Sequence, residues 1–353
     1  MPELAEVERA RRLVEECCLG ARVKSVLAAE SGGGPRNGMV DTKVLQVLAV
    51  KNDDEIAVER ILSKRLAKAC VKAVLRKGKH FWIDFGTFSL AFHLGMSGNM
   101  RVKGKKSLKY RRTVSSEDEV SWPPRYSKLI LKFTNNVELA FTCPRRFGRV
   151  RMLQNPAMLQ SPIRDLGFDP LTEMLGESEF YEAMQARAKP VKAALLDQSF
   201  SAGVGNWIVD EVCFQARIHP ATPCKRLSKV AAEAVRQSLE RVVSFAVECN
   251  ADHAKFPDTW LFHFRWNKGK NVKYMGKYKI VYSTIGGRTT AIVPHVQKQS
   301  NGVSSNLCNS KKEGGSKKRK RKLSAQVKPE KDIISKCRRS KRIAAATIKN
   351  ECA

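Results

Sequence analysis

The sequence predicts an α+β protein of several domains, with a helix and a β-sandwich or barrel first, then helices, a β-hairpin and a polar basic tail. Three observations carry this prediction. Residues 2–19 have the apolar spacing of an amphipathic helix, short apolar runs separated by Gly and Asn turns fill 22–153, and the period becomes helical from about residue 175. We place the domains at 1–155, 156–250, 251–296 and 297–353.

The first element is predicted from apolar residues at helical spacing. Leu4, Val7, Ala10, Val14 and Cys17 lie on one face of a helix over 2–19 that can end at a glycine. The stretch 31–66 is irregular and predicts a loop followed by a helical insertion. The strands expected in this domain are 22–28, 71–76, 80–85, 88–94, 128–134, 137–142 and 149–153.

The second half is predicted to be helical before a final hairpin. A hairpin of 277–283 with 288–293 follows from the turn at Ile285, Gly286 and Gly287. From residue 297 the chain is polar and lysine-rich, which is typical of disorder. The expected helices are 176–187, 190–198, 205–215 and 227–249.

The charge predicts a polyanionic partner. The chain of 353 residues has 65 Lys and Arg against 34 Asp and Glu, a net charge of +31. Residues 297–353 hold 17 Lys and Arg and 4 Asp and Glu, so the tail contributes +13 and the remaining residues +18. The body is therefore basic without its tail, which favours nucleic-acid binding.

Cysteine spacing and hydropathy exclude other classes. The ten cysteines include no C-x-x-C pair and no Cys pair facing a His pair at zinc spacing, so we predict no metal and no cofactor. No apolar run approaches the roughly 18 residues of a membrane span, and the start does not resemble a secretion signal. We expect a reduced intracellular compartment, no membrane partner and a monomer, since no heptad pattern appears.

The N-terminus carries the residues best suited to covalent catalysis. Removal of Met1 before a small residue would expose the secondary amine of Pro2, and an α-amine titrates near neutral pH. Attack of such an amine on a sugar carbon gives an iminium ion, and Glu3 beside it can move protons. The alternative is that Pro2 is a suitable first residue of a helix and Glu3 a partner of its dipole.

Two further segments suit an enzyme that flips a base out of a duplex. Residues 93–98 (HLGMSG) end a strand in a glycine-flanked turn that presents Met96, and 144–148 (PRRFG) place Arg145 and Phe147 at a strand edge. Apolar wedges and an arginine can fill the space that a flipped base leaves. Taken alone, the Met96 turn is also consistent with core packing, and the two arginines of PRRFG are also consistent with a solvated phosphate contact.

Two more segments suit phosphate binding, and a single lysine stands before a strand. Residues 203–206 (GVGN) precede a helix, where backbone N–H groups favour an anion and predict a phosphate clamp. Arg288 follows Gly286 and Gly287 in the hairpin and can grip a phosphate with two N–H groups. Lys79 precedes a strand, and in isolation it is equally consistent with a surface lysine.

In this order the segments resemble the formamidopyrimidine-DNA glycosylase (Fpg/Nei) superfamily, in its plant-type form with a zincless finger. The resemblance spans roughly residues 2–297. It implies a catalytic β-sandwich domain, a helix–two-turn–helix DNA-binding domain and a zincless β-hairpin finger. The matching segments are Met1-Pro2-Glu3-Leu4 with Glu6-Val7-Glu8, HLGMSG, PRRFG, GVGN followed by Glu211, and GGRTT.

The resemblance also implies catalytic roles. Pro2 would attack C1′ of the damaged nucleotide to form a Schiff base, and Glu3 would donate and accept protons. Lys79 would assist phosphate binding and β-elimination, and Arg288 would assist phosphate binding and δ-elimination. The residues implied to face the DNA are the void-filling Met96, Arg145 and Phe147, together with Lys189 and Asn206.

The sequence departs from the bacterial pattern of the family. Ala5 stands where a second proline is usual, and Cys143 stands where an Asp precedes PRRFG, which predicts looser local hydrogen bonding. The four-cysteine zinc finger is absent although the hairpin motif remains. No segment is matched to the loop that caps a flipped 8-oxoguanine.

The predicted function is a bifunctional DNA glycosylase and abasic-site lyase of base excision repair. Its expected partner is damaged double-stranded DNA, and its substrates are oxidised or ring-opened purines, formamidopyrimidine first and 8-oxoguanine as a further candidate. The alternatives are a Nei-like enzyme for oxidised pyrimidines or abasic sites, and a non-catalytic basic DNA-binding protein. The basic clusters at 317–322 and 337–342 predict a nuclear location, through an import receptor or as a tether to DNA.

Overall fold

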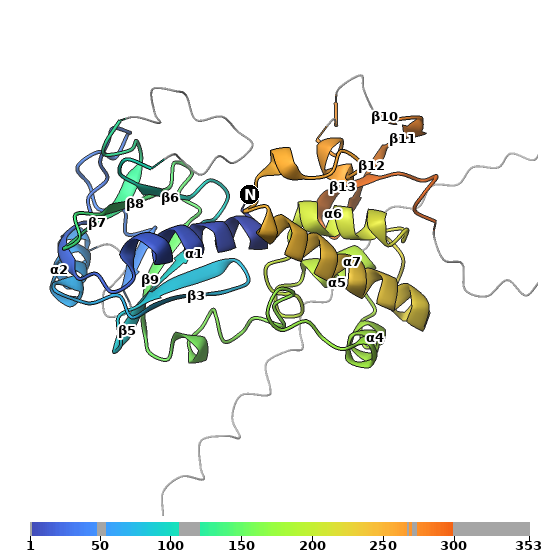
Figure 1. Cartoon of the computed structure of the whole chain (residues 1–353), viewed down its shortest axis with the longest axis horizontal. Helices are drawn as coiled ribbons and strands as arrows, with labels where there is room; N and C mark the ends of the chain where they lie inside the picture. Colours follow the sequence, from blue (N-terminus) through green and yellow to red (C-terminus); the bar gives the residue numbers. More distant parts are fainter. Residues whose placement is uncertain (1, 48–53, 106–120, 267, 270–273, 299–353) are drawn as a thin grey trace, which may run out of the picture. The chain divides into compact units, whose positions relative to one another are not determined.

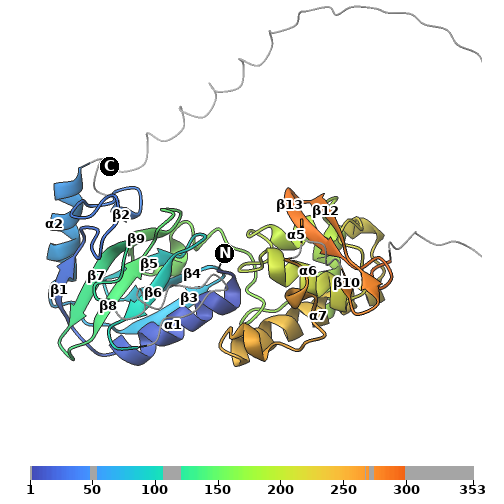
Figure 2. The ribbon, with the colours of Figure 1, turned by 90° about the horizontal axis from the view of Figure 1, so that it is seen from above.

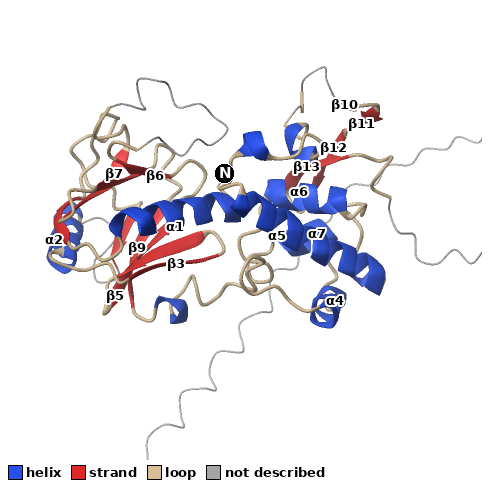
Figure 3. Ribbon diagram, in the orientation of Figure 1, coloured by secondary structure: helices blue, strands red, loops and turns tan. Residues whose placement is uncertain are grey.

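The computed structural model describes residues 2–47, 54–105, 121–266, 268–269 and 274–298. Strands dominate its first half and helices its second (Figure 3). The tail predicted to be disordered lies outside the described residues from 299 onward. Gln297, which the sequence places in that tail, is buried and bonds Val293 and Ile218, so the folded region reaches past 296.

Helix α1 (Leu4–Cys18) is the predicted first helix, and it begins two residues later than expected. The backbone N–H of Glu3 donates to the Glu6 carboxylate (3.0 Å), which closes the first turn. On the apolar face of the helix, Val7, Ala10, Val14, Cys17 and Cys18 pack in the core of the strand region. Leu4 and Ala5 belong to the core of the helical region. The helix therefore carries its N-terminal residues to the place where the two cores meet.

Two sheets face each other across the first core, which makes the predicted sandwich. One sheet has the order β1-β7-β8-β6 and the other β2-β9-β5-β4-β3, and all neighbours are antiparallel except β2 and β9 (Figure 2). The strands are β1 (Val23–Leu27), β2 (Leu45–Val47), β3 (Ala73–Lys77), β4 (His80–Asp84), β5 (Phe88–His93), β6 (Asn99–Val102), β7 (Ser127–Phe133), β8 (Glu138–Thr142) and β9 (Arg149–Gln154).

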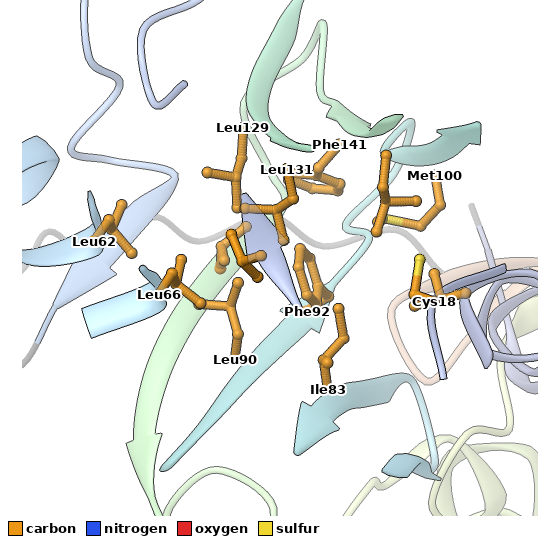
Figure 4. Packing of buried hydrophobic residues seen from close by; sticks show 14 of the residues in the cluster. Cys18, Leu62, Leu66, Ile83, Leu90, Phe92, Met100, Leu129, Leu131 and Phe141 are labelled. Atoms are coloured by element: carbon orange, nitrogen blue, oxygen red, sulfur yellow. The ribbon is translucent and has the colours of Figure 1, made fainter. Parts of the chain in front are cut away.

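Side chains from both sheets and two helices fill this core (Figure 4). Phe92 on β5 stacks on Phe81 and meets Phe141 of the opposite sheet edge-on, with ring centroids 5.0 and 5.7 Å apart. Helix α2 (Glu55–Leu66), the expected helical insertion, adds Leu62 and Leu66. Alternation along the strands thus holds one face of each sheet in the core and leaves the other face outside it.

The helical region has its own core. It is built on α4 (Glu177–Gln185), α5 (Val191–Leu196), α6 (Asn206–Gln215) and α7 (Lys229–Glu248), with 3₁₀ turns at Cys224–Arg226, His253–Lys255 and Leu261–His263 (Figure 1). A further 3₁₀ turn, Ala157–Leu159, packs on the five-stranded sheet with Trp82 and Leu153. No helix among the described residues is long and apolar enough to cross a membrane.

Three strand predictions differ from the structure. β2 and β6 were not expected, because each is short and β6 carries an asparagine and an arginine. The final hairpin pairs β12 (Val281–Ile285) with β13 (Arg288–Ile292), so its first strand begins at 281 and not 277. Residues before it form a separate hairpin of β10 (Tyr274–Met275) and β11 (Tyr278–Lys279).

Candidate active site

The Glu3 carboxylate is held by the start of helix α6. Its Oε1 accepts from the backbone N–H of Trp207 (2.9 Å) and its Oε2 from that of Ile208 (3.1 Å), and the side chain is 2% exposed. The first N–H groups of a helix have no partner within the helix and carry partial positive charge, so they suit a carboxylate. Burial raises the pKa of Glu3, and the nearby Lys79 opposes that shift.

This geometry corrects the prediction for the glycine-rich loop. The sequence predicted that GVGN and the following helix start would hold a phosphate, but Glu3 occupies the N–H groups of Trp207 and Ile208. A side chain at Gly205 would place its Cβ 2.1 Å from the Glu3 Cδ, so only glycine fits there. The start of the helix therefore seats an internal carboxylate, and the DNA contact of Asn206 stays a prediction.

Pro2 directly precedes Glu3, two residues before α1 begins, and is buried. The Leu4 N–H donates to the Gly203 carbonyl (3.1 Å), which ties the start of the helix to the glycine-rich loop. Met1 lies outside the described residues. The predicted pair of Pro2 and Glu3 is therefore fixed by a loop some 200 residues away in the sequence.

Lys79 reaches the same loop from the turn between β3 and β4. Its Nζ donates to the Val204 carbonyl (2.9 Å). Burial lowers the pKa of Lys79, and the nearby Glu3 partly offsets this effect. The turn is itself anchored, because the Gly78 N–H donates to the buried Asp169 (2.7 Å), which also pairs with Arg76. The structure thus brings Pro2, Glu3 and Lys79 together.

The final hairpin joins this group through α6. The Asn206 side-chain amide donates to the Thr289 carbonyl (2.9 Å), and Arg288 is exposed at the preceding position. Gly286 and Gly287 both have positive φ (59° and 70°), as a two-residue hairpin turn requires. Arg288 is close enough to Lys79 to lower its pKa, so the predicted fourth catalytic residue lies near the first three.

A buried ion-pair network under the hairpin was not predicted from the sequence. The Lys192 ammonium contacts Asp210 (2.6 Å), Arg265 contacts the same carboxylate (2.8 Å), and the Ala291 N–H donates to it (3.3 Å). Lys192 and Asp210 are fully buried. Burying a lysine or an aspartate costs free energy unless its charge is paired. The presence of both residue types within apolar helical segments was therefore the one signal in the sequence for this network.

Lys189, the lysine that the resemblance selected, lies elsewhere. It is exposed and pairs with Asp197 (2.8 Å), and none of the hydrogen bonds described for it reaches Pro2, Glu3 or Lys79. It lies just before helix α5, whereas Lys192 lies in the first turn of that helix. The structure therefore leaves Lys189 on the surface and gives Lys192 the contact with α6.

The two loops predicted to fill the void left by a flipped base are in contact. Met96 is 41% and Phe147 48% exposed, and the Arg145 guanidinium lies over the Phe147 ring at 5.3 Å from its centroid. A Cβ at Gly95 would lie 2.4 Å from the Phe147 carbonyl carbon, so the loops approach each other at a glycine. An exposed methionine, arginine and phenylalanine are thus displayed together.

The neighbouring Arg146 holds one of these loops in place. It has φ of 56° and forms two hydrogen bonds to the buried Asp41 (2.7 and 2.9 Å), which also contacts Lys128 (3.1 Å). Lys128 pairs in turn with Glu30. Arg146 and Lys128 hold the pKa of Asp41 below its usual value despite burial. The stretch before α2 therefore supports the PRRFG turn.

Cys143 does not loosen this turn as the sequence predicted. The Gly148 N–H donates to its Sγ (3.2 Å) and the Arg146 N–H to its carbonyl (3.2 Å), so the buried thiol supplies an acceptor within the turn.

Comparison with known proteins identifies the family of this site and fold. Residues 1–150 match the formamidopyrimidine-DNA glycosylase N-terminal domain, and residues 166–258 match the formamidopyrimidine-DNA glycosylase H2TH domain. A formamidopyrimidine-DNA glycosylase of Arabidopsis thaliana is 40% identical over 300 residues, which cover 84% of this chain and 71% of that protein. One from Acinetobacter baylyi is 31% identical over 248 residues, covering 70% and 77%.

Solved structures agree in fold. A complex of the Lactococcus lactis Fpg with DNA containing an abasic site is 23% identical, with a TM-score of 0.63 over 84% of this chain and 100% of that chain. A complex of a point mutant of the Lactococcus lactis protein with DNA containing Fapy-dG is 24% identical, with the same TM-score and coverage.

These matches define the class as DNA glycosylases, enzymes of base excision repair. The chain belongs to the formamidopyrimidine-DNA glycosylase family. The family, fold class and enzyme class predicted from the sequence are thereby confirmed.

Proposed function

We propose that this protein is a bifunctional DNA glycosylase and abasic-site lyase that removes oxidised or ring-opened purines through a Schiff base at Pro2. One observation carries the proposal. Pro2 and Glu3 directly precede helix α1, and the Leu4 N–H and the Glu3 carboxylate are bonded to the GVGN loop and to the helix that follows it. Lys79 donates to the Val204 carbonyl of the same loop. A DNA-binding protein without chemistry has no need of a buried carboxylate and a lysine of lowered pKa beside an N-terminal proline.

The proposed reaction uses Pro2 as the nucleophile. After removal of Met1, the Pro2 nitrogen forms a bond to C1′ while the bond from C1′ to the base breaks. The base leaves with the electron pair and takes up the proton that the Pro2 nitrogen loses. The sugar ring then opens as Glu3 protonates its oxygen, which leaves an iminium ion on Pro2. Because burial raises the pKa of Glu3, its carboxyl keeps a proton at higher pH than an exposed glutamate does.

Strand cleavage follows from the iminium ion. Loss of a proton from C2′ expels the 3′ phosphate by β-elimination, and loss of a proton from C4′ expels the 5′ phosphate by δ-elimination. The lowered pKa of Lys79 suits a group that takes and returns a proton, and its remaining positive charge suits a phosphate. The exposed Arg288 suits the second phosphate, because a guanidinium offers two parallel N–H donors.

The exposed side chains of the two loops suit the gap that a flipped base leaves in the duplex. Met96 and Phe147 are apolar wedges and Arg145 a donor for the unpaired base, so we assign them to filling the void. Asn206 and the exposed Lys189 complete the proposed DNA contacts.

Lesion preference separates this proposal from its alternative within DNA repair. The Arabidopsis and Acinetobacter relatives are named formamidopyrimidine-DNA glycosylases, and a Lactococcus Fpg complex contains Fapy-dG DNA, which supports a purine lesion. The test is a panel of duplexes, each with one formamidopyrimidine, 8-oxoguanine, oxidised pyrimidine or abasic site. We expect base release and strand cleavage with formamidopyrimidine. Cleavage of oxidised pyrimidines or abasic sites alone would favour the Nei-like alternative, and salt-sensitive binding without any cleavage would favour a non-catalytic protein.

We further propose that the protein acts as a monomer in the nucleus. The support is the sequence: basic clusters at 317–322 and 337–342 suit an import receptor or DNA. Fluorescence microscopy of the full chain and of a variant with glutamine at 317–322 tests the location, and sedimentation tests the oligomeric state.

Because Asp41 holds Arg146 in the PRRFG turn, we expect Asp41→Asn to weaken binding to damaged DNA. The asparagine keeps the shape but removes the charge that holds Arg146 and Lys128. We expect affinity for a duplex with a reduced abasic site to fall on the order of tenfold, or about 1.4 kcal/mol, because a turn that is held less firmly must be ordered on binding. Titration by fluorescence anisotropy measures it, after circular dichroism has shown that the variant is folded. Asp165→Asn, an exposed change, is the control, and equal affinity of the two variants would contradict this support.

A further inference from the structure

A second cluster of basic side chains lies on the face of the five-stranded sheet that points away from the sandwich core. Cross-strand pairing aligns His80 of β4, His93 of β5 and Arg149 of β9 in one row. Arg151 follows in the next row, opposite the small Ala91. Directly opposed residues have Cβ atoms about 5 Å apart and side chains on the same face. All four side chains are half-buried.

The four side chains of this cluster include no carboxylate, and its two imidazole rings are in contact. The rings of His80 and His93 lie 4.8 Å apart. Burial and neighbouring cations, Arg151 among them, lower the pKa of His80 to about 3 and that of His93 to about 4. Within the part of the chain that the structure describes, the Arg151 guanidinium has no hydrogen bond or ion pair, and burial together with Arg149 lowers its pKa.

Two neighbouring guanidinium groups that are half-buried without an acidic partner raise the free energy of the folded protein. Binding of an external anion lowers it again. Removing a charge from water is unfavourable unless it is paired, and like charges close together add to that cost. The buried cations Lys128 and Lys192 of this chain each face carboxylates. Arg149 and Arg151 differ, because the contacts described for Arg149 are with the carbonyls of Arg146 and Gly148.

The cluster is continuous with the candidate active site. His80 directly follows Lys79, His93 ends the strand that leads into the Met96 turn, and Arg149 is two residues after Phe147. An apolar group covers this face from the row of Arg151 onward: Trp82 and Ala91 stand in that row, and Leu153, Ala157 and Ile163 pack with them. The uncovered end therefore lies next to the side chains assigned to the damaged nucleotide.

We propose that Arg149 and Arg151, which lie in this cluster beside His80 and His93, bind the phosphodiester backbone of the DNA that flanks the lesion. The proposal rests on the function proposed above and adds to it a binding surface that neither the catalytic group nor the void-filling loops contain. β4, β5 and β9 together span about 10 Å across the sheet, room for a short stretch of backbone. Guanidinium groups supply two donors each to a phosphate.

The test is the salt dependence of binding to a duplex with a reduced abasic site. We expect Arg151→Gln and Arg149→Gln to weaken binding at low salt and to reduce the slope of log K against log salt by about 0.9 for each phosphate that the variant no longer neutralises. Arg60→Gln is the control, since this exposed arginine is on α2, which packs on the inner face of the sandwich. Arg151→Lys keeps the charge and should restore most of the slope.

A truncated duplex makes the test specific to the flanking backbone. Shortening the duplex on one side of the lesion should lower the salt slope of the wild type by the same amount. The slope of the double variant, Arg149→Gln with Arg151→Gln, should not change on that shortening. Slopes of the glutamine variants equal to that of Arg60→Gln would overturn the proposal. Borohydride trapping of the wild type on the same lesion separates this result from failure of the proposed function: trapping without a slope change rejects only the cluster, and no trapping on any lesion rejects the glycosylase proposal.

Discussion

Glu3→Gln lowers the rate of base excision by about 100- to 10,000-fold, the usual contribution of a positioned acid or base. Glutamine has nearly the same shape but cannot donate the proton that sugar opening requires. It also has one acceptor oxygen where Glu3 has two, so one of the N–H groups of Trp207 and Ile208 loses its partner. Single-turnover release of the base from a formamidopyrimidine duplex measures the effect.

The matched control for this prediction is Glu16→Gln on the same helix. Glu16 is well exposed and pairs with Lys105 far from the site, so its loss should leave excision unchanged. An excision rate for Glu3→Gln within a few-fold of the Glu16→Gln rate would show that the buried carboxylate is only structural.

Asp210→Asn destabilises the fold by about 3–5 kcal/mol, the cost of breaking a buried ion pair from one side. Its carboxylate faces Lys192 and Arg265 and accepts the Ala291 N–H. Without the negative charge, two cations remain buried beside a neutral amide. Because Ala291 lies in β13, the hairpin that carries Arg288 should also be held less firmly. Urea unfolding of residues 1–298 or of the full chain gives the free energy of unfolding.

Lys192→Met provides the comparison for Asp210→Asn. This change removes one cation but leaves Asp210 paired with Arg265, so the loss of stability should be smaller. A free energy of unfolding for Asp210→Asn within about 1 kcal/mol of the wild type would contradict the role given to this network.

The order of elements was predictable from the sequence because it is expressed in local patterns. The spacing of Leu4, Val7 and Val14 predicts α1, and the alternation of apolar residues predicts most strands of both sheets. The short strands β2 and β6 could not be predicted, since their place is decided by pairing with distant strands and not by their own composition. Propensity is a weak guide in segments of three or four residues.

The site was only partly predictable, for a related reason. Pro2, Glu3 and Lys79 could be named from motifs, but the contact between Glu3 and α6 joins residues that are 204 positions apart. The sequence therefore predicts an external phosphate at the glycine-rich loop, whereas in the fold the start of the helix after this loop binds the Glu3 carboxylate. Lys192 was not named at all, because its burial depends on the contacts with Asp210 and, through that carboxylate, Arg265.

The contact that supports the PRRFG turn could likewise not be predicted from the sequence. Asp41 lies in a stretch without a regular pattern, and its partner Arg146 is 105 residues away. Only the folded chain shows that this carboxylate and a positive φ at Arg146 hold the turn that displays Arg145 and Phe147.

Borohydride trapping with mapping of the adduct tests the central claim most directly. The protein freed of Met1 is mixed with a formamidopyrimidine duplex and borohydride, and the cross-linked peptide is identified by mass spectrometry. The proposed mechanism predicts one adduct, on the nitrogen of Pro2, and its loss when Pro2 is replaced by glycine or the N-terminus is acetylated. An adduct on Lys79 or another lysine, or trapping that survives acetylation, would contradict it.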